Sequence, residues 1–591
     1  MRVNRLLLRP IATAAVTALL VTTGCSSSGG TITRADATES PIETGGDSNE
    51  HGSLRWGECD PDDIAVDDTV FRAAEAAGLQ CASLEVPVDH AKPEGETIEI
   101  ALGRYRAAQR ADRIGSLVVN PGGPGGSGLE FLANAGMLLP AALTDRFDIV
   151  SFDPRGLAAS EDLECFTEDE RESWITSDPD YDEGDPVAVQ QEATRFETEL
   201  LDGCRDDDAE LLANIGTSSV IDDLDAIREA IGDEQLSFLG MSYGTRIGAG
   251  YATRYPDRVR AIALDSPVTP SRSIAELTVG QSQGIAAAIA EFIAWCDADT
   301  TCPAGPDTAA TIKTVAQQLD ATPIAADPDT GVDSLDADTF STAVITAMYD
   351  PSYSGPLAEA LTSLDADSLQ RNDAVTFLAG LAGMQHSRKP DGGYGNGFEL
   401  QSLVNCADAD APLPQEQAAT IADPVRAYFT DEPTAVAGAC TIIPTGDQLP
   451  IEATSAADRM LVIGTVGDPA TPYPWMAEMA DALGVTKRIT YRGSGHAVSL
   501  TNQCVAPQLA TFFTAPTDFA PADCERNPDE RDIYALFSTQ FATLGLPASV
   551  TACIVEELRA TVSPLALAAA NSSPETSDVV GEISGIALRC R

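Results

Sequence analysis

The stretch LSFLGMSYGTRIG, residues 236–248, places a serine between two glycines directly after an apolar run. The apolar run predicts a buried strand, and the pattern over residues 245–255 predicts a helix that begins directly after the turn. In such a sharp turn the serine takes a strained backbone conformation, and side chains at Gly240 or Gly244 would collide with the neighbouring strand and helix. Because the turn lifts the hydroxyl above the sheet, we predict that Ser242 is a nucleophile.

The sequence on either side of this turn alternates between predicted strands and helices. The short apolar stretches CASLEVPV, TIEIALGRY, GSLVVN and FDIVSFD come before it, and RAIALD follows it. Between them, SSVIDDLDAIREAIG carries apolar residues at helical spacing and ends at Gly232, a residue typical of the position just past a helix. This alternation predicts an α/β fold, with a parallel sheet that helices cover on both faces.

The alternation stops after residue 268 and resumes only near RMLVIGTVGD, an interval too long for a structureless loop. Apolar residues at helical spacing within it predict a large, mostly helical insertion at residues 269–454. We expect residues 54–268 and 455–526 to form the two parts of the core. Residues 527–591 are mostly helical by pattern and are expected to form a small C-terminal extension.

The N-terminus carries an export signal. Three arginines precede a short apolar run, which ends in VTTGC and is shorter than the ~20 residues that cross a bilayer. A cysteine after small residues resembles a bacterial lipobox, so residues 1–25 are predicted to be a lipoprotein-type signal peptide ending at Cys25. A lipid on Cys25 would hold the protein at the outer face of the cell membrane; the alternative is a simply secreted or cell-envelope protein. The polar residues 26–53 are predicted to be a flexible tether.

Acidic residues far outnumber basic ones, and the formal net charge is −55. A charge of this sign repels a phosphate backbone, which argues against any nucleic-acid partner. It indicates a well-solvated surface or, alternatively, an attraction for cationic substrates such as peptide amines. The oligomeric state stays open at this point.

Twelve cysteines follow Cys25, and an even number in an exported chain predicts disulfides. None has CxxC spacing, and the four histidines are scattered, so no metal site is predicted. The simplest expectation is six bridges between successive cysteines, although the sequence alone leaves the pairing open. The twelve are Cys59, Cys81, Cys165, Cys204, Cys296, Cys302, Cys406, Cys440, Cys504, Cys524, Cys553 and Cys590.

A serine nucleophile needs a general base, and on this kind of sheet the order along the chain is serine, acid, histidine. Only two histidines follow the serine. His496 ends ITYRGSGH, a predicted strand followed by a glycine turn, and we predict that it is the base. His386 lies in a polar stretch of the insertion, and we expect its side chain to be solvated or to line the insertion. His51 and His90 lie upstream and are expected to be structural.

The predicted acid is Asp468, which ends the buried-looking strand LVIGTVGD between the serine and the histidine. Its role would be to hold the imidazole tautomer and to stabilise the imidazolium. Thr471, in the following DPATP, is expected to hydrogen bond and fix the loop of this acid.

Acyl transfer also needs N–H donors for an oxyanion. The residue after the nucleophile, Tyr243, supplies one. The loop in SLVVNPGGPGGSG, residues 116–128, is expected to supply the second, because its glycines let backbone approach a substrate. A phosphate-binding loop is the rival interpretation, but no GK[ST] follows and G-x-G-x-x-G spacing is absent.

Taken together, these residues resemble the α/β-hydrolase exopeptidases of the proline iminopeptidase and tripeptidyl aminopeptidase group, in particular the exported actinobacterial kind. The resemblance rests on NPGGPGGSG, FDPRG, DDLDAIREAIG, GMSYGTRIGAGYATRYPDRV, LVNCAD, GDPATP and GSGH. It implies Ser242, Asp468 and His496 as a triad and Gly123 with Tyr243 as oxyanion donors, supported by Gly122. It also implies that the insertion is a cap whose carboxylates bind the substrate's free amino terminus. The chain departs from the family pattern at Ala158 and Ser266, where glycine is usual.

These inferences predict a serine exopeptidase that releases tripeptides or similar short peptides from a peptide or protein with a free N-terminus. No cofactor is required. A carboxylesterase or lipase acting on envelope or small esters is the first alternative, because the same triad serves both reactions. A catalytically inactive surface-binding protein is the second.

Overall fold

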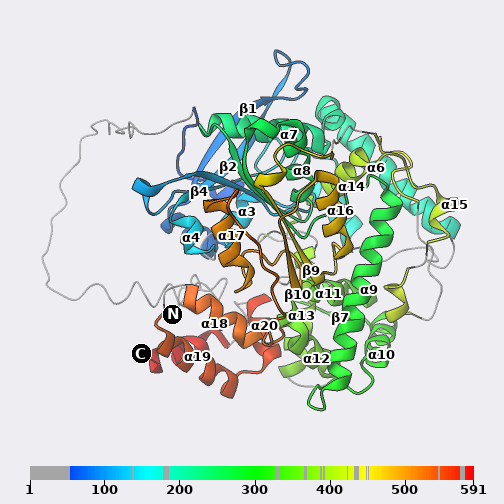
Figure 1. Cartoon of the computed structure of the whole chain (residues 1–591). Coiled ribbons are helices and arrows are strands. Elements are labelled where there is room, and N and C mark those ends of the chain that lie inside the picture. Colours follow the sequence, from blue (N-terminus) through cyan, green and yellow to red (C-terminus); the bar gives the residue numbers. More distant parts are fainter. Residues whose placement is uncertain are drawn as a thin grey trace, which may run out of the picture.

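The computed structural model describes residues 53–590, apart from 136–138, 177–185, 328–329, 331, 365–368, 386–388, 390–392, 422, 431–437, 447–448, 450, 544–545 and 573–578. A single large sheet runs through the upper part of the molecule, and helices surround it (Figure 1). The predicted signal peptide, Cys25, most of the tether, His51 and His386 lie outside the described residues.

The sheet has eight strands in the order β1-β2-β4-β3-β5-β6-β9-β10. From β4 to β10 all neighbours are parallel, as predicted, whereas β2 is antiparallel to both β1 and β4. The parallel prediction is wrong for these first strands because a short connection, residues 88–96, joins β1 to β2, and a short connection forces a hairpin. The strands are β1 (Gln80–Pro87), β2 (Thr97–Tyr105), β3 (Gly115–Asn120), β4 (Phe147–Phe152), β5 (Leu236–Met241), β6 (Val259–Asp265), β9 (Met460–Gly467) and β10 (Arg488–Ser494).

Helices cover both faces of the sheet, as predicted. Successive residues of a strand point to opposite faces, so Leu117 and Val119 of β3 join one apolar cluster and Val118 joins the other. The cluster around Val118 includes residues of α7, α8 and α16, and the opposite cluster includes residues of α2, α3, α4 and α17. The helices are α2 (Asp68–Ala76), α3 (Gly128–Ala135), α4 (Ala141–Thr144), α5 (Glu168–Thr176), α6 (Pro186–Ala213), α7 (Thr217–Ala230), α8 (Gly244–Arg254), α16 (Pro474–Leu483) and α17 (Val505–Thr514).

The insertion leaves the sheet after β6 and returns at β9. Most of its regular structure is helical, and a two-stranded sheet of β7 and β8 lies within it. One of its helices, α14, packs back on the sheet through Leu400, Leu403 and Val404. Its elements are α9 (Ile274–Ala298), α10 (Thr308–Ala321), β7 (Ile324–Ala325), β8 (Ser334–Leu335), α11 (Ala337–Ala347), α12 (Ser354–Ser363), α13 (Leu369–Gln385), α14 (Gly397–Asp408) and α15 (Gln415–Ala418).

The C-terminal extension is helical and lies beside α12 and α13 of the insertion (Figure 1). One apolar core contains residues of both parts: Phe340, Phe377 and Leu381 from the insertion, and Phe537 and Leu558 from the extension. The extension therefore completes the core of the insertion. Its helices are α18 (Ile533–Thr543), α19 (Ala548–Thr561), α20 (Pro564–Ser572) and α21 (Val579–Arg589).

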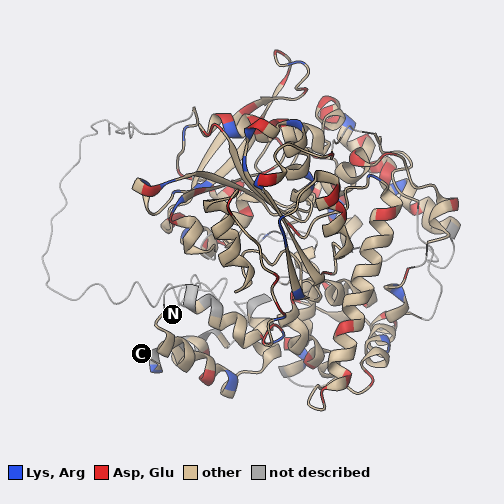
Figure 2. Cartoon of the chain, viewed as in Figure 1, with Lys and Arg blue, Asp and Glu red and all other residues tan. Residues whose placement is uncertain are grey.

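All twelve cysteines after Cys25 form disulfides, and each pairs with its successor, as expected from the sequence. Each bridge closes a local loop, which restricts the unfolded chain. Among the described helices, none combines the length and apolar character of a membrane span. Acidic side chains are spread over the outer helices of the core and of the insertion (Figure 2). The bridges are Cys59–Cys81, Cys165–Cys204, Cys296–Cys302, Cys406–Cys440, Cys504–Cys524 and Cys553–Cys590.

Candidate active site

The turn around Ser242 has the predicted strained geometry. β5 ends at Met241, α8 begins at Gly244, and Ser242 between them has φ +52°. A Cβ atom on Gly240 would lie 2.2 Å from the carbonyl oxygen of Gly244, and one on Gly244 would lie 2.7 Å from Oδ1 of Asn120 on β3. The predicted collisions with helix and strand are therefore confirmed, and only glycine fits on either side of the serine.

The structure brings Asp468 and His496 together. Nδ1 of His496 lies 2.9 Å from Oδ1 and 3.1 Å from Oδ2 of this carboxylate, which directly follows β9 and is 4% exposed. Oδ1 also accepts the backbone N–H groups of Ala470 and Thr471 at 2.9 and 2.8 Å. Oδ2 accepts the Thr471 hydroxyl at 3.0 Å, as predicted. The carboxylate is thus held by its own loop and aimed at the imidazole.

Strand β6, which lies between β5 and β9, connects this pair to the serine. The backbone N–H of Ser242 donates to the carbonyl oxygen of Asp265 at 3.0 Å. The Asp265 carboxylate accepts the N–H of Ser499 at 2.8 Å, and Oγ of Ser266 accepts the N–H of Ala497 at 2.9 Å. Because parallel strands end at the same edge of a sheet, the turn, the acid and the histidine loop all meet at the carboxyl end of β6.

The glycine loop after β3 lies against the serine turn. A Cβ atom on Gly122, whose φ is +107°, would lie 2.6 Å from the carbonyl oxygen of Met241 and 2.9 Å from Cβ of Ser242. Gly122 N–H donates to Oδ1 of Asn120 at 3.1 Å, and the next residue, Gly123, is exposed. The structure therefore places the expected oxyanion loop beside the expected nucleophile.

The side chain of Tyr243 is buried under the turn. Its hydroxyl lies 2.6 Å from Oγ1 of Thr217, which donates to Oδ2 of Asp408 at 2.7 Å. Since a carboxylate only accepts, Thr217 uses its proton there and accepts the proton of Tyr243. This chain of hydrogen bonds fixes the residue whose backbone N–H is the other expected oxyanion donor. Asp408 ends the LVNCAD motif of the insertion, and its contact with Thr217 was not predicted.

Tyr349, from the insertion, contacts the histidine directly. Its carbonyl oxygen accepts the backbone N–H of His496 at 3.0 Å, and the two rings meet edge to face with centroids 5.3 Å apart. Burial, with a contribution from the charge of Asp468, raises the pKa of Tyr349 to about 12. The Tyr349 phenol, which contacts the imidazole, is therefore uncharged at physiological pH.

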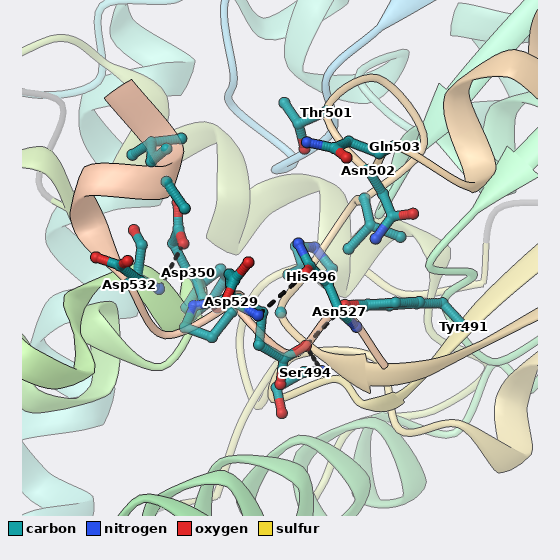
Figure 3. A pocket seen from close by; sticks show the side chains of 18 of the residues that line it. Asp350, Tyr491, Ser494, His496, Thr501, Asn502, Gln503, Asn527, Asp529 and Asp532 are labelled. Atoms are coloured by element: carbon teal, nitrogen blue, oxygen red, sulfur yellow. Dashed lines mark hydrogen bonds between the residues drawn. The ribbon is translucent and has the colours of Figure 1, made fainter. Parts of the chain in front are cut away.

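A cavity of about 270 Å³ opens beside His496, between its loop, the insertion and the extension (Figure 3). Asp350 lines it from the insertion, and Asp529, Glu530 and Asp532 line it from the extension. Figure 3 shows Asp350 and Asp532 on one side of His496, with Tyr491 and Asn502 on the other. Carboxylates near the candidate base were expected from the insertion only, so those of the extension are a finding of the structure.

Of the remaining histidines, His90 is structural, as expected. Its Nε2 lies 2.7 Å from Oδ1 of Asp223 on α7. The fully buried guanidinium of Arg155 donates to both oxygens of the same carboxylate, at 2.8 and 2.7 Å. This cluster ties the turn after β4 to α7.

Residues 115–503 match the model of the alpha/beta hydrolase fold family. The chain belongs to this family. The mixed eight-stranded sheet with helices on both faces agrees with this fold.

Named relatives of this alpha/beta hydrolase include peptidases. Serine protease Hip1 of Mycobacterium tuberculosis is 34% identical, over 74% of this chain and 85% of that protein. A tripeptidyl aminopeptidase of Streptomyces coelicolor is 30% identical, over 76% of this chain and 83% of its own. Carboxylesterase B of Mycobacterium tuberculosis is 31% identical, over 74% and 85% of the two chains. These relatives identify the chain as a serine hydrolase.

The activity of the hydrolase should fall on acidification through a pH above 6.5, the ordinary pKa of a histidine side chain. Burial alone would lower the pKa of His496, but the charge and hydrogen bond of Asp468, with the charge of Asp265, outweigh it and raise the pKa above 6.5. A general base must be neutral, so kcat/KM is expected to fall as the pH drops through this raised value. Rates on one substrate on both sides of pH 6.5 test this, and an acid limb centred below 6.5 would contradict it.

Sequence reasoning missed the roles of two residues near the candidate base, Asp265 and Ser266. Asp265 is buried at the end of β6, and burial raises its pKa to about 6 despite its hydrogen bonds from Ser499. Ser266 has φ +54°, which explains why glycine is usual there, and its hydroxyl holds the residue after His496. The only sequence signal for either was LDS in place of LDG.

Proposed function

We propose that this hydrolase is an exported serine exopeptidase that releases short peptides, tripeptides or similar, from substrates with a free N-terminus. Ser242 is the nucleophile, His496 the general base and acid, and Asp468 the group that orients the imidazole. The observation that carries this proposal is the Asp468–His496 pair, hydrogen bonded at 2.9 Å, on the same sheet edge as the strained Ser242.

In this mechanism Nε2 of His496 takes the hydroxyl proton while Oγ of Ser242 attacks the scissile carbonyl carbon. The carbonyl oxygen becomes an oxyanion that accepts the N–H groups of Gly123 and Tyr243. Collapse of this intermediate breaks the C–N bond, and the imidazolium of His496 gives its proton to the departing amine. A water molecule, deprotonated by the same imidazole, then attacks the acyl-enzyme and restores Ser242.

Three features favour peptides with a free amine. Two of the relatives are a serine protease and a tripeptidyl aminopeptidase. The net charge of −55 attracts cationic substrates. Asp350, Asp529, Glu530 and Asp532 line the cavity beside His496. Glu530 and Asp532 also pair with Arg526 and Arg559, so Asp350 and Asp529 are the carboxylates that would favour an ammonium group over a neutral one.

Export is supported by the six disulfides, which persist in oxidising compartments. The proposed location is the outer face of the cell membrane, through a lipid on Cys25. A change of Cys25 to serine, followed by fractionation of membrane and medium, tests the anchor.

An esterase function is the second candidate, because one relative is a carboxylesterase. Three substrates separate the two: a tripeptide amide with a free amine, its N-acetylated form, and a short acyl ester. Loss of a charged hydrogen-bonded contact lowers binding energy enough to predict a drop in kcat/KM of about 10- to 100-fold on acetylation. Equal rates on the free and acetylated peptides, with faster ester turnover, would favour the esterase. The absence of turnover on all three would favour an inactive binding protein.

A further inference from the structure

Glu291, on α9 of the insertion, reaches the ends of the two strands that lead to the candidate acid and base. Its Oε1 accepts the hydroxyl of Ser494 at 3.0 Å, two residues before His496. A Cβ atom on Gly467, the residue before Asp468, would lie 3.0 Å from its Oε2. The carboxylate therefore sits where β9 and β10 end, in contact with both loops.

Two arginines of the segment before α18 hold this carboxylate. Nη2 of Arg531 donates to Oε1 of Glu291 at 2.9 Å, and Nη2 of Arg526 also donates to it. Burial alone would raise the pKa of Glu291. The hydrogen bonds from Arg526 and Ser494, with the charges of Arg526 and Arg531, outweigh burial and lower the pKa. The group is thus ionised at neutral pH and links the insertion, the sheet and the extension.

Glu530 of the extension also binds the end of β10. Oε2 of Glu530 accepts the hydroxyl of Tyr491 at 2.7 Å and the N–H of Ser494 at 3.3 Å. Arg531 also donates to Oγ of Ser354 at the start of α12, at 2.7 Å. Ser494 is therefore bonded through its side chain to Glu291 of the insertion and to Arg526, and through its backbone to Glu530 of the extension.

Helix α9 also packs directly on the loop of the acid. A Cβ atom on Gly284 would lie 2.5 Å from the carbonyl oxygen of Pro469, the residue after Asp468. Such a close approach leaves no room for α9 to shift toward this loop. A shift of α9 toward this loop would therefore displace Pro469, the neighbour of Asp468.

We propose that Glu291 is a positioning residue for the Asp468–His496 pair, and that it acts by fixing Ser494 and Gly467 with the help of Arg526 and Arg531. The inference rests on the proposed triad. It makes the docked extension a condition for full activity, because Arg531 of the extension and Arg526, directly before it, hold the Glu291 carboxylate. Neither arginine nor Glu291 touches the substrate in this scheme.

The test compares Glu291→Gln with Glu276→Gln, an exposed glutamate on the same helix. Fluorophosphonate titration counts the folded sites, and kcat, KM and the labelling rate are expressed per titrated site. Misplacement of catalytic groups by a fraction of an ångström predicts a kcat about 10- to 100-fold lower for Glu291→Gln, with KM nearly unchanged. The acid limb of its pH profile should move to lower pH, because a loosened Asp468 raises the pKa of His496 less. Glu276→Gln should match the parent protein.

Ser494→Ala keeps the test decisive if Glu291→Gln folds poorly, and the double variant is added where Glu291→Gln folds well. Both should show the same shift of the acid limb, and the two single effects should not add, because one group acts through the other. A loss of titrated sites with unchanged kcat and pH profile per site would overturn the proposal and leave Glu291 as a structural latch. Failure of the triad itself would appear differently, as parent protein that fluorophosphonate does not label at Ser242.

Discussion

Replacement of Ser242 by alanine is expected to abolish turnover. Removal of a serine nucleophile from such a triad lowers kcat by about 10⁴- to 10⁶-fold, because the oxyanion donors and substrate binding alone remain. The fold should persist, since alanine keeps the backbone N–H that bonds Asp265. Steady-state rates on a free tripeptide amide and fluorophosphonate labelling measure the effect. Ser83→Ala, at an exposed position of β1, is the matched control.

Two results would contradict this assignment. Labelling that survives in Ser242→Ala would place the nucleophile elsewhere. Turnover within about tenfold of the parent rate would mean that the observed hydrolysis does not pass through an acyl-enzyme on this residue.

Asp468→Asn should have the next largest effect, a fall in kcat of about 10³- to 10⁴-fold. An amide in place of the carboxylate can present its NH₂ to Nδ1, which favours the wrong imidazole tautomer and leaves the imidazolium unsupported. The N–H groups of Ala470 and Thr471 still bind the amide oxygen, so the loop should hold its shape. The rate should be measured at its pH optimum, since the acid limb is expected to move down as well.

Asp265→Asn is the control variant for Asp468→Asn. Asp265 is also buried near His496, but its carboxylate accepts Ser499, whereas Asp468 contacts Nδ1. Removal of its charge should shift the acid limb slightly and leave most of kcat. A large fall in kcat for Asp265→Asn, together with a small fall for Asp468→Asn, would mean that Asp265 and not Asp468 orients the imidazole.

Local sequence pattern was sufficient for the features that depend on neighbours in the chain. The turn at Ser242 was predictable because glycine on both sides, a strand before and a helix after are all written within thirteen residues. The disulfides match the simplest expectation, because each joins successive cysteines, although the sequence alone left the pairing open. The pairing of Asp468 with His496 was expected from the order serine, acid, histidine along the chain and from the predicted strand before each residue.

Contacts between distant segments left no such pattern. Glu291 is one of many acidic residues on amphipathic helices, and its partners Arg526 and Arg531 lie more than two hundred residues away in sequence. Tyr349 and Ser266 likewise meet the histidine loop only through tertiary packing. The direction of β2 was missed because apolar alternation predicts a strand without fixing which way it runs.

The common apolar core of the insertion and the extension has a consequence for biosynthesis. Translation delivers α12 and α13 before α18 to α21, so the faces that bury Phe377 and Leu381 stay uncovered until the last helices emerge. A nascent chain at that stage exposes apolar surface, which makes it prone to aggregation until those helices cover it. Full hydrolytic activity is therefore expected only after the last helices of the chain have been synthesised and have docked on the insertion.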